Sequence, residues 1–172
     1  LELETWDGKA WIGLVPFDMV IRPRAMPRFG RQSHFLEMNI RTYVRKTGTA
    51  DAENPAVGKP GVWFFSLDAE RWLAVRAARR LFHLPYFDAD MSLERDDESV
   101  YYRSQRTHDG TEPALFQARY APTGQPYEAE PGTLEHFLTE RYCLYAHDGS
   151  SLYVAEVHHA PWPLRRAELQ VQ

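Results

Sequence analysis

The chain has 172 residues, 13% of them aromatic, and a formal net charge of −4 at pH 7. We therefore expect one domain over residues 1–172 with a substantial core, and we expect no general nucleic-acid binder. The lone cysteine, Cys143, excludes an internal disulfide, and no run of 18 apolar residues predicts a membrane-spanning helix. A cytoplasmic protein is the expectation. Because Leu1 stands in what reads as the middle of an element, we also expect an N-terminal segment to be missing.

The first part of the chain is predicted to form strands joined by turns. Asp7-Gly8 is a hairpin signal, and residues 10–15 read as a strand that Pro16 closes. Residues 22–31 hold four arginines among prolines and a glycine. We interpret them as a solvated connection, with a flexible lid as the less favoured alternative.

Residues 34–44 alternate between two kinds of side chain, as a strand does. The face expected to meet the core carries Leu36, Met38, Ile40, Thr42 and Val44. The opposite face carries Phe35, Glu37, Asn39, Arg41 and Tyr43. In bulk water these polar residues need no explanation, whereas in a cavity a carboxylate, an amide, a guanidinium and a phenol would stand about 7 Å apart. The polar residues 47–60 that follow are predicted to form a loop.

Residues 61–87 are predicted to form a buried strand followed by an amphipathic helix. The valine and aromatic residues that open this stretch favour a pleated, buried strand. Ser66 or Asp68 is placed to cap a helix over residues 69–82, and Pro85 ends that helix. The apolar arc of the helix carries Leu73, Ala74, Val75, Ala77, Ala78, Leu81 and Phe82, and its cationic side carries Arg76, Arg79, Arg80 and His83.

The second half of the chain is predicted to consist mostly of strands joined by short turns. In chain order we expect a hairpin over residues 91–95 and 99–106, a strand over 115–120, a loop over 122–131, a helix over 133–142 capped by Thr133, a hairpin over 143–146 and 152–158, and an irregular covering strand in the tail. Because strands far outnumber helices, the fold class is a mainly antiparallel α+β domain.

Few residues carry a specific chemical signal. His136 and Glu140 stand four residues apart on a predicted helix, but no third ligand at a diagnostic spacing follows, so we predict no metal site. Cys143 lies among apolar residues, where a free cysteine is typically a small buried hydrophobe. No motif typical of nucleotide binding or acyl transfer occurs, and no cofactor is predicted.

Six blocks of sequence follow one another along the chain: FLEMNIRTYV, GVWFFSLDA, ARRLFHLPYF, YRSQR, PGTLEHFLTERYCLY and HHAPWPL. Together they resemble the YqjF-type uncharacterised family, a domain of unknown function in the acetoacetate decarboxylase-like superfamily. The resemblance covers essentially the whole chain. It implies a mainly antiparallel, cone-shaped β-barrel with peripheral helices and a central cavity. It also favours the alternative in which the face with Glu37, Asn39, Arg41 and Tyr43 looks into that cavity. Decarboxylases of the superfamily place a glutamate on the comparable strand, and Glu37 in FLEMN matches that position.

The same resemblance predicts that the usual reaction is absent. Decarboxylases of the superfamily use a lysine that forms a Schiff base, close to the end of the helix that corresponds to residues 69–82. Tyr86 and Phe87 stand at that place in this sequence, and none of the three lysines (Lys9, Lys46 and Lys59) comes near it. Without a buried amine no iminium can form, so we expect no Schiff-base decarboxylation.

Two functions from different classes remain. The first is a small-molecule pocket that binds an organic acid or carbonyl compound, with Glu37 as an acid or base. Its binding residues would be Arg41 and Asn39, with Tyr43, Arg103 and His136 as further candidates. Arg41, Arg103 and Arg106 are candidates for a bidentate clamp on a ligand carboxylate. Their interpretation as surface arginines in strands is equally favoured. The second function is a non-catalytic binding or interaction module with a filled barrel core, in which Trp63, Trp72 and Trp162 mark packing or an interface in a homo-oligomer.

Overall fold

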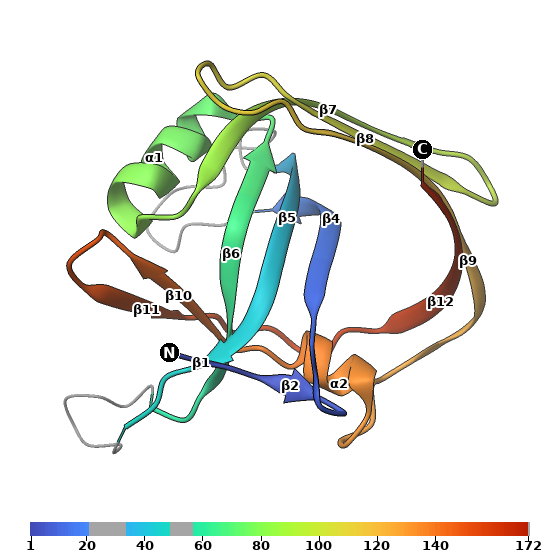
Figure 1. Ribbon diagram of the computed structural model, residues 1–172. Helices are drawn as coiled ribbons and strands as arrows, with labels where there is room; N and C mark the ends of the chain where they lie inside the picture. Colours follow the sequence, from blue (N-terminus) through green and yellow to red (C-terminus); the bar gives the residue numbers. More distant parts are fainter. Residues whose placement is uncertain (21–33, 49–56, 172) are drawn as a thin grey trace, which may run out of the picture.

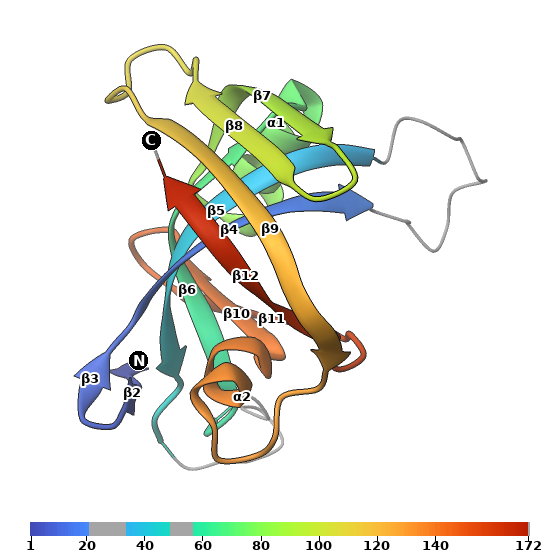
Figure 2. The same cartoon turned by 90° about the vertical axis from the view of Figure 1, so that its right-hand side faces the viewer.

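The computed structural model describes residues 1–20, 34–48 and 57–171, so the predicted connection at 22–31 and most of the predicted loop at 47–60 lie outside the described residues. Figures 1 and 2 together label the helices and strands. They are β1 (Glu2–Leu3), β2 (Thr5–Trp6), β3 (Lys9–Ala10), β4 (Ile12–Val20), β5 (His34–Arg45), β6 (Pro60–Ala69), α1 (Trp72–Phe82), β7 (Tyr86–Arg95), β8 (Val100–Arg106), β9 (Leu115–Tyr127), α2 (Leu134–Thr139), β10 (Cys143–His147), β11 (Leu152–Glu156) and β12 (Leu164–Val171).

One large sheet dominates the structure and curls into a half-barrel (Figures 1 and 2). Its strand order is β1-β5-β6-β7-β8-β9-β12, with β4 beside β5 and the β10–β11 hairpin attached to β6. All of its pairs are antiparallel except β6–β7 and β6–β10. The strand-rich, mainly antiparallel architecture predicted from the sequence is confirmed. Neither helix of the described residues is long and apolar enough to cross a membrane.

The predicted tight turns and the predicted cap of the second helix are confirmed. Asp7 and Gly8 have positive φ angles, 49° and 70°, and join β2 to β3 as a tight hairpin. The hairpins predicted around residues 96–97 and 147–150 connect β7 to β8 and β10 to β11. The hydroxyl of Thr133 accepts a hydrogen bond from the backbone N–H of His136 at 3.3 Å, which caps α2.

The predicted cap of α1 is wrong. Ser66 and Asp68 lie inside β6, which continues to Ala69, and the helix begins only at Trp72. Its N-cap residue, Arg71, makes no side-chain capping hydrogen bond. The reason is tertiary, because β5 and β7 pair with the end of β6 and keep these residues extended.

The apolar arc of α1 is wider than the surface that the helix covers. Val75 is buried, and Ala74 and Ala78 pack beside it against the core. Leu73 and Leu81 belong to the same predicted arc, yet both are exposed, Leu81 by 70%. A helical periodicity gives the direction of an apolar face, whereas the width of the partner surface decides how much of it is buried.

Several strands run further than the sequence predicts. β4 continues through Pro16 to Val20, β9 continues through Pro122 to Tyr127, and the tail forms the regular strand β12. At both sites the strand has a partner on one side only, which is the edge position where proline is tolerated in a sheet. The second helix is shorter than predicted and ends at Thr139.

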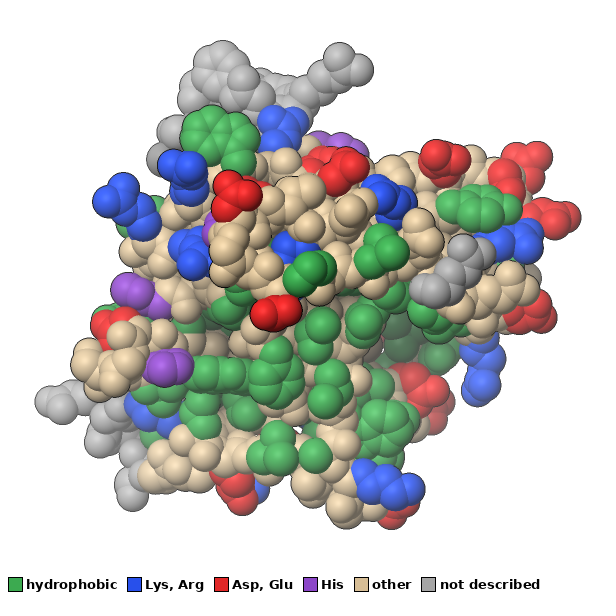
Figure 3. All heavy atoms as spheres, turned by 45° about the horizontal axis from the view of Figure 1, so that its top comes forward, with side chains coloured by type: hydrophobic (Ala, Val, Ile, Leu, Met, Phe, Trp, Pro, Cys, Tyr) green, Lys and Arg blue, Asp and Glu red, His purple; other side chains and the backbone are tan. Residues whose placement is uncertain are grey.

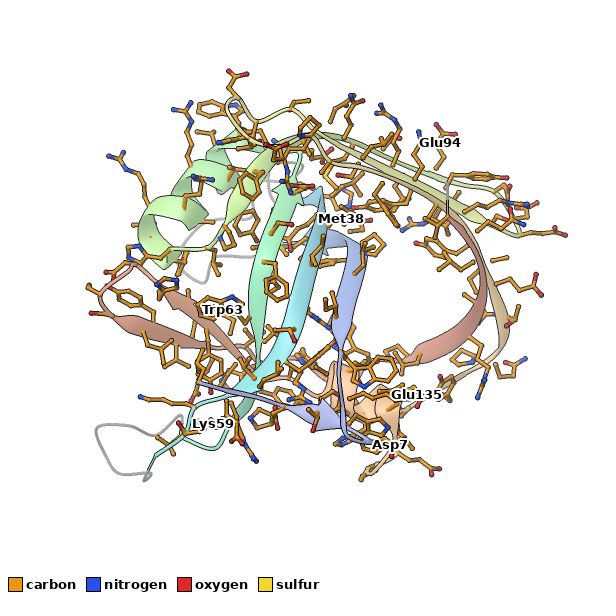
Figure 4. All side chains as sticks on the ribbon, viewed as in Figure 1. Asp7, Met38, Lys59, Trp63, Glu94 and Glu135 are labelled. Carbon is orange, nitrogen blue, oxygen red and sulfur yellow. The ribbon has the colours of Figure 1, made fainter. Side chains whose placement is uncertain are left out.

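The core consists of clusters on both faces of β5. Phe35 packs with Leu67, Val75 and Tyr86 beneath α1, and Met38 packs on the other face with Met91 and Tyr102 of β7 and β8. Figure 4 labels Met38 and shows it between β5 and the curled part of the sheet. Both faces of the strand are therefore buried along most of its length.

Hydrophobic side chains remain exposed along the two edges of the half-barrel. Ile12 and Leu14 of β4 are exposed, as are Leu169 and Val171 of β12. In the space-filling view, hydrophobic side chains gather in a band across the middle of one face, between charged side chains above and below (Figure 3).

Candidate functional site

A buried carboxyl group lies at the centre of the candidate site. Glu37 is 1% exposed, and its Oε2 accepts a hydrogen bond of 2.5 Å from the Tyr86 hydroxyl. Its Oε1 accepts a longer hydrogen bond, 3.4 Å, from Nδ2 of Asn39. The backbone carbonyl of Glu37 accepts a hydrogen bond of 2.8 Å from the Tyr102 hydroxyl. Side chains from three strands therefore hold this residue in place.

Strand register brings Glu37 and Tyr86 together. Asn39 pairs with Leu67 across β5 and β6, and Leu67 pairs in turn with Tyr86 of β7. Alternation along β5 keeps Glu37 and Asn39 on one face, so Tyr86 and Glu37 share the face that α1 covers. Tyr86 thus has its hydroxyl on the buried glutamate.

Burial controls the protonation of this pair. It raises the pKa of Glu37 to about 7, against an ordinary 4.5, and hydrogen bonds from Tyr86 and Asn39 and the charge of Arg41 offset part of that rise. The pKa of Tyr86 is raised far above its usual range, first by burial and then by the neighbouring Glu37 charge. Tyr86 therefore stays a hydrogen-bond donor while Glu37 exchanges a proton near neutral pH.

Two atoms beside the carboxyl group have unused hydrogen-bonding capacity. Oδ1 of Asn39 and Nε of Arg41 are buried and have no hydrogen-bond partner among the described residues. The guanidinium of Arg41 is held by a 3.3 Å hydrogen bond from Nη2 to the carbonyl oxygen of Leu138. Buried polar atoms nearly always have a partner, so an acceptor and a donor without one indicate a place for another polar group.

Of the other sequence-predicted residues, Tyr43 lies beside Arg41, whose guanidinium carbon is 5.7 Å from the centroid of the Tyr43 ring, whereas Arg103 and His136 lie apart from this cluster. Tyr43 is buried against Phe137 of α2, with the ring centroids 5.3 Å apart. Arg103 points to the face of β8 opposite Tyr102 and forms a surface ion pair of 3.4 Å with Asp90. His136 lies in α2, where its backbone N–H is bonded to the Thr133 hydroxyl. The structure keeps Glu37, Asn39, Arg41 and Tyr43 on one face of β5 and brings Tyr86 of β7 to it, and it places Arg103 and His136 elsewhere.

The predicted helical pair of His136 and Glu140 is not formed. Glu140 follows the end of α2, and its carboxylate accepts a hydrogen bond from the Tyr142 hydroxyl. In the part of the chain that the structure describes, no group of three His, Cys, Asp or Glu side chains is arranged to hold a metal ion.

A buried ion pair that was not predicted from the sequence joins β6 to β8. Asp68 is 1% exposed and pairs at 2.8 Å with Arg106, whose side chain is 12% exposed. The Arg106 guanidinium also lies 4.1 Å from the centroid of the Phe87 ring. Arg106, a candidate clamp for a ligand carboxylate, thus binds a carboxylate of the protein itself. The signal in the sequence that could have predicted this pair is Asp68 itself, an acidic residue within an otherwise largely apolar strand.

All three lysines lie in the described residues, away from Glu37. Lys59 forms an ion pair with Glu156 at the surface, Lys9 is in the β2–β3 hairpin, and Lys46 follows β5 beside Val57. Figure 4 shows Lys59 at the end of β5 and β6 remote from Met38, the chain neighbour of Glu37. The basic group that acts on Glu37 is the Arg41 guanidinium.

Comparison with known proteins gives one family and one curated relative. Residues 1–172 match a family of uncharacterized conserved proteins, DUF2071. The chain is 43% identical over 172 residues to an uncharacterized protein, YqjF, of Bacillus subtilis. That alignment covers 99% of this chain and 66% of the relative, so the chain spans just under two thirds of the relative's length. No solved structure matches the chain.

Proposed function

We propose that this chain, which belongs to the DUF2071 family of uncharacterized conserved proteins, binds a small organic acid or carbonyl compound beside Glu37. The observation that carries the proposal is the buried hydrogen bond between Glu37 and Tyr86. Beside it, Asn39 and Arg41 each have a buried polar atom with no hydrogen-bond partner among the described residues. A ligand carboxylate or carbonyl oxygen would accept a hydrogen bond from Arg41. A hydroxyl or enol of the ligand would donate to Asn39.

The proposed chemistry is proton exchange by Glu37. A carboxyl group with a pKa of about 7 is present in both protonation states at neutral pH, which suits a general acid or base. Tyr86 keeps its proton and holds the carboxyl group in position. We further propose that the half-barrel is of the acetoacetate decarboxylase-like type. Its supports are the curled antiparallel sheet and the contact of Glu37 with the residue at the lysine-equivalent position.

Borohydride trapping with acetoacetate is expected to leave the protein unmodified, because no lysine amine lies beside Glu37 to form a trappable iminium. Intact-mass spectrometry after incubation with acetoacetate and borohydride is the measurement. A stable adduct that peptide mapping places on any lysine would refute the exclusion of Schiff-base chemistry.

The substitution Arg41→Ala is expected to weaken binding of a short 2-oxo or 3-oxo acid, found by thermal-shift screening, by about tenfold or more. Loss of a hydrogen bond to a charged group costs about 1.5–3 kcal/mol. Titration calorimetry measures the change. Arg45→Ala is the matched control, because Arg45 lies on the same strand but forms an exposed ion pair with Glu2. Equal affinities of the two variants would remove Arg41 from the site.

An interaction module is the second candidate function. Trp72 and Trp162 are both exposed, and an exposed tryptophan is typical of a surface that another molecule covers. Sedimentation velocity at increasing protein concentration tests this alternative. Self-association that Trp72→Ala or Trp162→Ala abolishes would favour it over the small-molecule site.

A further inference from the structure

An open cleft of about 620 Å³ lies outside the Glu37 site, within the size range of small-molecule sites. It is formed where the C-terminal end of α1 approaches β6 and the turn of the β10–β11 hairpin (Figure 1). Its lining includes Trp63, Phe65, Arg79, His83, Phe87 and His147. Figure 4 shows Trp63 on the side of β6 that faces the hairpin. The lining is thus rich in both aromatic and basic side chains.

Flat rings line the β6 side of the cleft. Trp63 and His147 are stacked, with their ring centroids 5.3 Å apart and their planes 18° apart. Phe65 is the extra residue of a bulge in β6, where Ile40 pairs with Ser66 and Arg41 pairs with Phe64, and its ring is exposed. Exposed and half-buried rings in a concave site offer stacking surfaces to a planar ligand.

Basic groups line the opposite side. Arg79 lies in the last turn of α1 and His83 is the C-cap residue of that helix, and both residues line the cleft. Arg79 donates one N–H to the carbonyl oxygen of Tyr86 at 2.6 Å, and a guanidinium has five N–H donors in all. Nδ1 of His147 accepts a hydrogen bond of 2.9 Å from the N–H of Gly149, which leaves Nε2 as the donor of that ring.

The acidic residue of the cleft, Asp148, accepts four hydrogen bonds from residues of its own hairpin. Its Oδ1 accepts hydrogen bonds from the N–H and the hydroxyl of Ser150 and from the N–H of Ser151. Its Oδ2 accepts one from the Tyr153 hydroxyl, and these bonds lower the pKa of the carboxyl well below its usual range. Asp148 therefore holds the β10–β11 turn together, and its carboxylate stays ionised beside the cleft.

We propose that this cleft binds a planar aromatic monocarboxylate. The ring of the ligand stacks on the Trp63 side of the cleft, and its carboxylate accepts hydrogen bonds from Arg79 and His83. A single negative charge is favoured over a polyphosphate, because the C-terminal end of a helix and the ionised Asp148 both repel added negative charge. The proposal is independent of the Glu37 site, which contributes no side chain to the lining.

Calorimetric titration with indole-3-carboxylate tests the proposal on the whole chain. We expect saturable binding, with indole-3-carboxamide and cyclohexanecarboxylate each weaker by about tenfold or more, because one lacks the charge and the other lacks the flat ring. Absence of saturable binding, or equal affinity for the carboxylate and the amide, would overturn the proposal.

Matched variants assign the binding to the cleft. Arg79→Gln and Trp63→Leu are expected to weaken indole-3-carboxylate binding by about tenfold or more, while Arg80→Gln, at the next and exposed position outside the lining, leaves it unchanged. If Arg79→Gln fails to fold, His83→Ala takes its place. Glu37→Gln is expected to have no effect. Loss of binding in Glu37→Gln but not in Trp63→Leu would place the ligand in the Glu37 site and overturn the assignment to the cleft.

Discussion

The free energy of unfolding is expected to decrease by about 3 kcal/mol as the pH rises from about 4.5 to 7. The Glu37→Gln variant is expected not to show this decrease. The pKa of Glu37 is about 7 in the folded protein, against 4.5 for an ordinary glutamate. Between these values the folded protein retains a proton that the unfolded chain has released, so folding is favoured at the acidic end of the window. Each tenfold difference in proton affinity corresponds to about 1.4 kcal/mol.

Urea unfolding at a series of pH values across this window measures the effect as the difference between the wild type and Glu37→Gln. The uncharged amide accepts the Tyr86 hydrogen bond, and Asn39 can turn its amide to pair with it, so the variant is expected to fold. Glu128→Gln, an exposed glutamate, serves as the control and should keep the slope of the wild type. Parallel curves for the wild type and Glu37→Gln would show that Glu37 is not held protonated in the folded protein.

The substitution Arg106→Ala is expected to destabilise the protein by about 3–5 kcal/mol at neutral pH. Asp68 is almost completely buried and its charge is balanced by Arg106 at 2.8 Å. Removing the guanidinium leaves an unpaired charge in the core and also removes the contact of Arg106 with the Phe87 ring. The midpoint of chemical unfolding, with its slope, measures the loss.

Two comparisons separate the charge effect from lost packing. Burial raises the pKa of Asp68, and Arg106 opposes that rise. Without the arginine, the Asp68 carboxyl is neutral over more of the acidic range, so Arg106→Ala should lose less stability at pH 5 than at pH 8. Adding Asp68→Asn to Arg106→Ala should restore part of the lost stability. Arg103→Ala, which removes a surface ion pair on the same strand, should cost less than about 1 kcal/mol. An equal loss at both pH values would contradict the electrostatic explanation.

The predicted placement of side chains agrees with the structure where all of them belong to one strand. Alternation along residues 34–44 placed Glu37, Asn39 and Arg41 on one face, and the structure keeps them there. The residues predicted to join them from other elements, Arg103 and His136, lie elsewhere. Tyr86 donates the hydrogen bond to Glu37, but from the sequence it was named only as a residue at the position where the resemblance places a lysine. Contacts within a strand follow from its period, whereas contacts between strands depend on register.

The sequence by itself determined the elements whose signals are local. The Asp7-Gly8 turn, the Thr133 cap and the end of α1 before Pro85 each depend on the conformational preferences of a few neighbouring residues. The tertiary structure decided the rest. Asp68 is a buried ion-pair partner and not a helix cap, because β5 and β7 extend β6 past it. Glu37 has a pKa near neutral because sheet and helix exclude water from both faces of β5, and such burial arises only when segments distant in the sequence pack together.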